Sequence, residues 1–142
     1  MKELLKLSNQ LCFPIYSLSK EICNAYRPLL DSLDVTYPQY LVMLVLWEHK
    51  KLNVREIGAL LGLDSGTLTP LLKRLETKAM VQRKRSAIDE RIVEVSLTAK
   101  GASLEDKAVC IPGQMLEKVA LTTEEQIQFK KIINKILNTI TK

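Results

Sequence analysis

Three cysteines are the most reactive side chains of this 142-residue sequence, namely Cys12, Cys23 and Cys110. Their number is odd and no pair has CxxC spacing, so neither a metal site nor a disulfide scaffold is expected. Cys12 falls in or near the first turn of a predicted helix, where backbone N–H groups favour the thiolate that reacts with oxidants. Taken alone, Cys12 also fits the usual fate of an unpaired cysteine, a buried and inert thiol.

A second group of polar residues lies on one predicted helix after Gly62. One face of this helix is apolar and should be buried, because Leu68, Leu71, Leu72 and Leu75 recur at steps of three and four. The other side carries short hydroxyls and cations, which contact phosphates and base edges in protein–DNA complexes: Ser65, Thr67, Thr69, Lys73 and Arg74. This arrangement predicts a recognition helix.

The flanking residues predict the rest of a winged helix-turn-helix between Asn53 and Leu97. Asn53 and Glu56 have capping-box spacing at the start of a first helix, and Gly62 is a natural stop. Apolar residues alternate with polar ones from Val93 to Leu97, which is typical of a strand. We therefore expect a mainly α protein with a small β-wing (α+β), the wing being a two-stranded ribbon with a basic tip.

The net charge of +5 is concentrated in this stretch. Seven cations and three acids lie between Lys73 and Arg91, so +4 of the excess falls there. A charge run is usually just a solvated face, but here it coincides with a predicted recognition helix and wing. We therefore expect double-stranded DNA as the partner, bound in part by the wing residues Arg83, Arg85, Asp89 and Arg91.

Two long apolar stripes lie outside the winged region. The first, from Leu4 to Ile22, predicts a long helix whose main part is capped by Ser8 or Asn9. Pro14 should give it a late start or a kink, and Pro28 should bend it. The last helix, opened by Thr122 or Thr123, carries a stripe from Phe129 to Ile140. That stripe either completes the core or, as we favour, forms a homodimer interface with the first helix.

The helices between these two are also marked by caps and prolines. Thr36 and Gln39 have capping-box spacing before a helix that runs through Trp47 and is apolar nearly all round, so it should be the central buried element. Thr98 is expected to cap the helix after the wing, and Pro112-Gly113 should break or bend it. We expect one domain over residues 1–142, with a winged part at about 36–98 and helical dimerisation regions at 1–35 and 99–142.

The sequence shows no secretory signal and no apolar run of the roughly 20 residues that a membrane span needs. We therefore expect a cytoplasmic protein with reduced thiols and no membrane partner.

Several blocks of the sequence resemble the MarR family of bacterial regulators. DERIVEVSLT, from Asp89 to Thr98, is similar to the wing signature of that family. The blocks LCFPIYSLSKEICNAYRPLLDSL, TYPQYLVMLVLWEH and LDSGTLTPLLKRLE resemble its organic-hydroperoxide-responsive, OhrR-like branch. The resemblance runs from about Leu11 to Gly113, whereas the last helix is similar only in pattern.

The resemblance implies a role for several residues. Cys12 matches the peroxide-sensing cysteine, and Tyr26 and Tyr37 match tyrosines of the partner subunit that hydrogen-bond its sulfur. Asp89 matches an acid that orients an arginine, here Arg91, which enters the minor groove. An apolar surround for an organic peroxide would come from the predicted sensor-pocket residues Phe13, Tyr16, Leu44 and Trp47.

The leading hypothesis is a homodimeric repressor that binds a pseudo-palindromic operator and is released when organic hydroperoxide oxidises Cys12. Eleven helical residues separate Cys12 from Cys23, about 16 Å, which excludes a disulfide within one chain. We therefore expect a small-molecule thiol to complete the reaction as a mixed disulfide. The alternative is a MarR-like repressor controlled by a phenolic or drug-like ligand. With one histidine, no CxxC and no cofactor loop, we expect neither an enzyme nor a cofactor.

Overall fold

The computed structural model describes residues 2–142 and divides the chain into two compact units. The first unit ends at Val109 and the second spans Cys110–Lys142. In the first unit lie η1 (Lys2–Leu5), η2 (Leu7–Asn9), α1 (Cys12–Leu30), η3 (Asp31–Leu33), α2 (Tyr37–His49), β1 (Lys51–Asn53), α3 (Val54–Leu61), α4 (Ser65–Thr77), β2 (Val81–Arg85), β3 (Val93–Leu97) and α5 (Ala99–Ala108). The second unit holds α6 (Ile111–Val119) and α7 (Thr123–Ile140).

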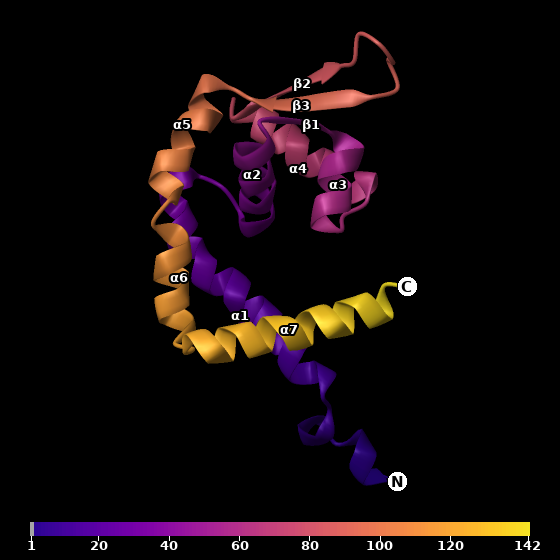
Figure 1. Ribbon diagram of the computed structural model, residues 1–142, viewed down its shortest axis with the longest axis vertical. Coiled ribbons are helices and arrows are strands. Elements are labelled where there is room, and N and C mark those ends of the chain that lie inside the picture. Colours follow the sequence, from indigo (N-terminus) through magenta and orange to yellow (C-terminus); the bar gives the residue numbers. More distant parts are fainter. Residues whose placement is uncertain (1) are drawn as a thin grey trace. The chain divides into compact units, whose positions relative to one another are not determined.

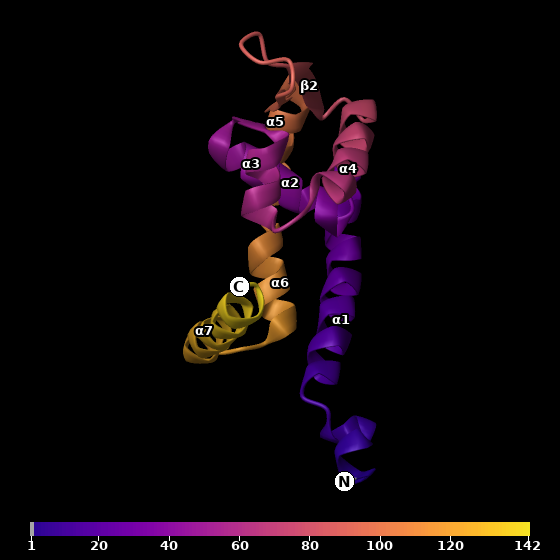
Figure 2. The same cartoon turned by 90° about the vertical axis from the view of Figure 1, so that its right-hand side faces the viewer.

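Helix α2 is the central buried element of the first unit, as predicted. The Thr36 side chain accepts from the Gln39 N–H and the Gln39 side chain accepts from the Thr36 N–H, so the predicted capping box is formed. Val42 and Leu46 are completely buried. Figures 1 and 2 show α2 next to α3 and α4, with the sheet along the ends of this cluster.

The predicted helix-turn-helix is formed by α3 and α4. Asn53 and Glu56 make the capping box of α3, and Gly62 ends the helix at a φ of 65°, a left-handed conformation that glycine adopts without strain. Leu68, Leu72 and Leu75 of α4 are completely buried. On α3, Ile57 is completely buried, whereas Leu60 is 55% exposed.

The wing differs from the expected two-stranded ribbon, because it is part of a three-stranded antiparallel sheet with the order β1-β3-β2. In the central strand, Val95 is completely buried and lies opposite Leu52 of β1 and Arg83 of β2. Strand β1 has three residues with a single apolar side chain, too short a segment to show a period of two.

Helix α1 begins at Cys12 and runs through Leu30. Its N-cap is Leu11, which makes no side-chain cap hydrogen bond, so the expected caps Ser8 and Asn9 are wrong. Both residues lie instead in the short 3₁₀ helix η2. Pro14 falls in the first turn of α1. Backbone N–H groups in a first turn have no acceptor within the helix, so proline, which lacks an N–H, costs no hydrogen bond there. This position confirms the predicted late start. The helix continues through Pro28 to Leu30, and the bend expected at Pro28 stays a prediction.

A close backbone contact fixes α5 after the wing. Thr98 caps α5 by accepting from the Gly101 N–H at 3.0 Å, and its own hydroxyl donates to the Ala79 carbonyl at 2.6 Å. A Cβ at Gly101 would lie only 2.0 Å from the Met80 carbonyl oxygen. The Trp47 indole Nε1 donates to the Gly101 carbonyl at 2.9 Å, so this glycine joins α2, α5 and the start of the wing.

In the second unit, Pro112 lies in the first turn of α6, so the predicted break falls between Ala108 and Ile111. Of the two residues expected to open α7, Thr122 is its N-cap, and it forms a capping box with Glu125. The stripe from Phe129 to Ile140 stays exposed. Among the described residues, no helix is long and apolar enough to cross a membrane.

Candidate nucleic-acid interface and thiol site

Helix α4 is held so that its polar side faces outward. Its buried leucines fix one face, and the Asp64 carboxylate caps its first turn by accepting from the Thr67 N–H at 2.7 Å. That hydrogen bond lowers the pKa of Asp64 below its usual value of 3.8. All five predicted contact residues lie on α4, with Thr69 half-buried and the others exposed: Ser65, Thr67, Thr69, Lys73 and Arg74.

A groove of about 920 Å³ runs between α3, α4 and the wing. It brings together residues that are far apart in the sequence, namely Asn53, Val54, Arg55, Gly58, Ala59, Leu63, Asp64, Ser65, Thr69, Leu72, Arg83, Asp89, Arg91, Ile92 and Val93. Arg55 was not among the predicted residues. Its signal in the sequence was weak, because one exposed cation beside a capping box is ordinary for a helix surface.

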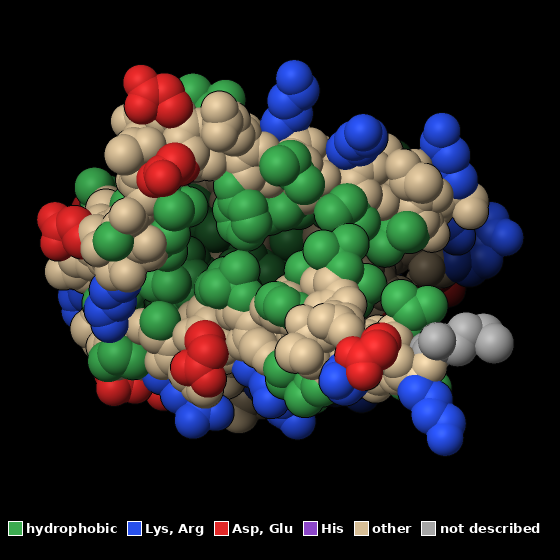
Figure 3. Space-filling model, turned by 90° about the horizontal axis from the view of Figure 1, so that it is seen from below, with side chains coloured by type: hydrophobic (Ala, Val, Ile, Leu, Met, Phe, Trp, Pro, Cys, Tyr) green, Lys and Arg blue, Asp and Glu red, His purple; other side chains and the backbone are tan. Residues whose placement is uncertain are grey.

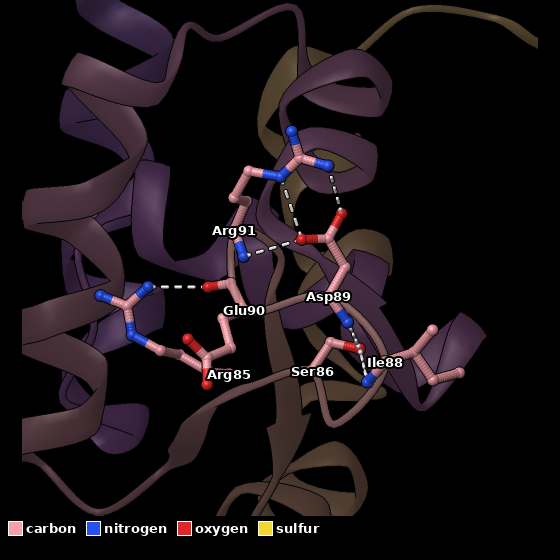
Figure 4. A network of polar contacts seen from close by, with 6 residues as sticks. All are labelled: Arg85, Ser86, Ile88, Asp89, Glu90 and Arg91. Carbon is pink, nitrogen blue, oxygen red and sulfur yellow. Dashed lines mark hydrogen bonds and ion pairs between the residues drawn. The ribbon is translucent and has the colours of Figure 1, made fainter.

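The predicted pair Asp89 and Arg91 is formed in the loop between β2 and β3 (Figure 4). The Arg91 Nε donates to Asp89 Oδ1 at 3.1 Å, and Arg91 Nη2 donates to Oδ2 at 3.1 Å. The Arg91 backbone N–H adds a third bond to Oδ1 at 3.0 Å. These hydrogen bonds lower the pKa of Asp89, so the carboxylate is ionised and holds the guanidinium in one orientation at neutral pH.

Two further residues shape the same loop. Arg85 Nη1 donates to the Glu90 carbonyl at 2.8 Å, which ties the end of β2 across the loop. The Ser86 hydroxyl accepts from the N–H groups of Ile88 and Asp89, at 3.2 and 3.4 Å. Ser86 was missed because a serine among charged residues in a loop has no distinctive spacing.

Arg83, also predicted to bind DNA, has a partner inside the fold. Its Nε and Nη2 donate to Glu76 Oε1 at 3.3 and 3.0 Å, and its backbone N–H donates to Oε2. These bonds lower the pKa of Glu76. Lys78, another cation of the basic stretch, donates to the Asp34 carbonyl and to Gln39 Oε1. The charge available to DNA is therefore smaller than the count of cations indicates.

The predicted sensing thiol, Cys12, is the first residue of α1 and is exposed. Phe13 and Tyr16 are exposed on the same turn of helix. Trp47 lies instead in the core of the first unit, 6% exposed. The four predicted sensor-pocket residues therefore do not enclose Cys12 within one chain, and Leu44 is exposed on α2.

The predicted tyrosines lie side by side where the last turns of α1 meet α2. Tyr26 and Tyr37 are stacked with their ring centroids 4.4 Å apart, and Tyr40 joins them at 5.8 Å from Tyr26. Burial raises the pKa of all three phenols, and the nearby Cys23 thiol contributes to the shift of Tyr37. Protonated phenols are hydrogen-bond donors, as a role beside a sulfur anion requires.

The thiol and the tyrosines of one chain lie far apart. Fourteen helical residues separate Cys12 from Tyr26, a distance of about 21 Å along α1. Neither Tyr26 nor Tyr37 therefore lies near the Cys12 of its own chain.

A helix-turn-helix followed by a wing, with further helices on both sides in the sequence, defines a winged-helix transcriptional regulator. Residues 24–108 match the family model of the SarA/Rot transcriptional regulators, and the chain belongs to this family. The predicted resemblance to the OhrR-like branch of the MarR family is confirmed. The chain is 51% identical over 136 residues to the organic hydroperoxide resistance transcriptional regulator of Bacillus subtilis (strain 168), covering 96% of this chain and 92% of that one.

Solved structures agree with this assignment. Reduced AbfR of Staphylococcus epidermidis bound to DNA is similar with a TM-score of 0.84 and 35% identity, over 99% of this chain and 97% of that one. The disulfide-formed structure of AbfR is less similar, with a TM-score of 0.67. A mutant of MarR from E. coli complexed with operator DNA has a TM-score of 0.82 at 26% identity, over 89% and 93% of the chains. The chain is therefore a transcriptional regulator and not an enzyme.

Proposed function

We propose that this chain is a homodimeric repressor that binds a pseudo-palindromic operator and releases it when organic hydroperoxide oxidises Cys12. The observation that carries the proposal is the division of α1, with an exposed thiol at its first residue and a cluster of phenols at its other end. A two-fold axis between two such helices brings the Cys12 of each copy to the tyrosines of the other. The name of the Bacillus subtilis relative supports the choice of effector.

The exposed apolar side chains of α1 and α7 support a dimer. On α1 they include Phe13, Ile15 and Leu18, and on α7 they form the stripe that ends at Ile140. Figure 3 shows that hydrophobic side chains, drawn in green, gather on the face of the molecule that is turned to the viewer. Apolar stripes of this length are rarely left in water, and burying them against a second copy removes them from it.

The proposed chemistry is a two-electron oxidation at sulfur. The Cys12 thiolate attacks one oxygen of the peroxide ROOH, the O–O bond breaks, and the products are the sulfenic acid and, after protonation, the alcohol ROH. A small-molecule thiol then attacks the sulfenic sulfur, so that an S–S bond forms and water leaves. The resulting mixed disulfide is larger than the thiol and carries no anion for the phenols to hold.

Loss of the proposed hydrogen bonds from the phenols to the Cys12 sulfur can change the position of the DNA-binding elements. Tyr26 stands on α1, Tyr37 stands on the first turn of α2, and α2 packs against α3 and α4. A shift of α1 relative to α2 therefore changes the spacing of the two recognition helices and wings in the dimer. A dimer binds its two half-sites only when that spacing fits the DNA helical repeat.

The test uses Cys12→Ser, with Cys23→Ser and Cys110→Ser as matched controls. Affinity for a duplex selected from random-sequence DNA by the unmodified protein is measured by fluorescence anisotropy, before and after cumene hydroperoxide with a small thiol. We expect Cys12→Ser to bind normally and stay bound, while both controls are released like the unmodified protein. Release of Cys12→Ser by the peroxide would refute Cys12 as the sensor.

A further inference from the structure

We infer that Ser86 is a positioning residue of the wing, whose hydroxyl presents the Asp89–Arg91 pair to DNA. This inference rests on the proposed role of that pair in DNA binding. Ser86 is the first residue after β2 and only 8% exposed, although it lies in a loop of otherwise accessible residues. A small polar side chain held this far from water in a surface loop needs a structural reason.

The hydrogen bonds of the loop supply that reason (Figure 4). The Ser86 hydroxyl accepts from the Ile88 and Asp89 N–H groups, while the Ser86 N–H donates to the Ile92 carbonyl at 2.8 Å. The Ile92 N–H in turn donates to the Asp89 carbonyl at 3.0 Å. The N–H and the carbonyl of Asp89 are therefore both fixed, one by Ser86 and the other by Ile92.

Ordering the Asp89 backbone places its carboxylate where the Arg91 backbone N–H can bind Oδ1, and the carboxylate then directs the Arg91 guanidinium. Packing gives the tip of the loop little order, because Ile88 is 98% exposed and the Arg91 side chain is 90% exposed. Local hydrogen bonds must then provide the order that a core provides elsewhere. Ser86 makes two of them with a single oxygen.

The serine side chain is short, so its hydroxyl can accept from backbone N–H groups two and three residues further along the chain. An alanine leaves the two N–H groups to water, so the loop samples other conformations and must be ordered when DNA binds. The folded unit loses little, since both groups are near the surface. Ser86→Ala should therefore weaken DNA binding far more than it lowers thermal stability.

The experiment compares Ser86→Ala with Ser86→Thr, which keeps the hydroxyl, and with Ser103→Ala, which removes a hydroxyl that donates to a backbone carbonyl in α5. The probe is the selected duplex, and thermal unfolding is followed in parallel. We expect Ser86→Ala to bind about five- to tenfold more weakly, which corresponds to a small net hydrogen-bond contribution in each of the two wings of a dimer. Ser86→Thr and Ser103→Ala should stay within about twofold of the unmodified protein, and melting should be unchanged for all three.

A double-mutant cycle shows whether Ser86 acts through Arg91. In an Arg91→Ala background, Ser86→Ala should have no further effect on affinity. Full additivity of the two changes, or unaltered binding by Ser86→Ala alone, would overturn the inference. If Arg91→Ala itself leaves binding unaltered, the proposed role of the pair in DNA binding fails and the inference fails with it. That outcome can be told apart from a failure of the Ser86 inference alone, because it is seen in the Arg91→Ala single variant.

Discussion

Arg91→Ala removes the guanidinium through which the wing is proposed to reach DNA. A guanidinium has five N–H donors, and two of those on Arg91, at Nε and Nη2, are bound to Asp89. The remaining three face solvent on a side chain that is 90% exposed. Removing them leaves the Asp89 carboxylate without its partner, and so replaces a cation beside the DNA by a bare anion.

The magnitude follows from counterion release. Each bound cation that neutralises phosphate charge and releases a counterion contributes about 0.9 to the slope of log K against log salt concentration, so the two Arg91 side chains of a dimer contribute about 1.8. Between 50 and 200 mM salt, the unmodified protein should therefore lose about tenfold more affinity than Arg91→Ala does. Arg91→Ala should also bind more weakly at every salt concentration in this range.

The assay is fluorescence anisotropy with the selected duplex over that salt range. Lys130→Ala, on exposed α7 and outside the winged unit, is the charge-matched control and should keep the full slope. A slope for Arg91→Ala equal to that of the unmodified protein would refute the assignment of Arg91 to the DNA interface.

Two further predictions concern the fold. Gly101→Ala should destabilise the protein by about 2–3 kcal/mol in urea unfolding, because its Cβ would meet the Met80 carbonyl oxygen, whereas Gly113→Ala, with open space around its Cβ, should be neutral or slightly stabilising. The pKa of Glu76 is lowered by Arg83, so its contribution to stability is present above the unfolded pKa and is lost as the pH falls through the lower folded pKa. Urea unfolding should therefore show constant stability near neutral pH and a decline below about pH 4, which Glu76→Gln makes shallower; an equally steep decline in that variant would contradict this assignment.

Much of the fold could be predicted because its signals lie within a few residues of one another. The stop at Gly62 and the capping boxes at Thr36 and Asn53 were found at their predicted positions, and the last helix is capped by Thr122, one of the two predicted residues. Three of the four predicted α4 leucines are completely buried, whereas Leu71 is only half-buried. Each depends on residues three or four apart on a single helix. The start of α1 was partly missed, since the residues before Cys12 form 3₁₀ turns that the same apolar spacing does not distinguish from an α-helix.

The candidate site was predicted less completely. Residue type placed Ser65, Lys73 and Arg91 on the outward side of the winged region, and the structure brings Ser65 and Arg91 to one groove. The sequence could not show that Arg83 is bound to Glu76, that Ser86 makes hydrogen bonds within the loop, or that Tyr40 joins the two predicted tyrosines. Each of these contacts depends on which side chains the folded chain brings next to one another.

The sequence by itself determined most of the helix limits, though not the start of α1, and also the helix-turn-helix, the position of the charge excess and the place of Cys12 in the first turn of α1. The tertiary structure decided which cations remain available, which hydrogen bonds hold the wing, and that Cys12 lies about 21 Å from the tyrosines of its own chain. The physical reason is that caps and apolar periods act between neighbours on one helix. Ion pairs, stacked rings and loop hydrogen bonds form only when strands and helices pack together, and their geometry depends on how these elements pack.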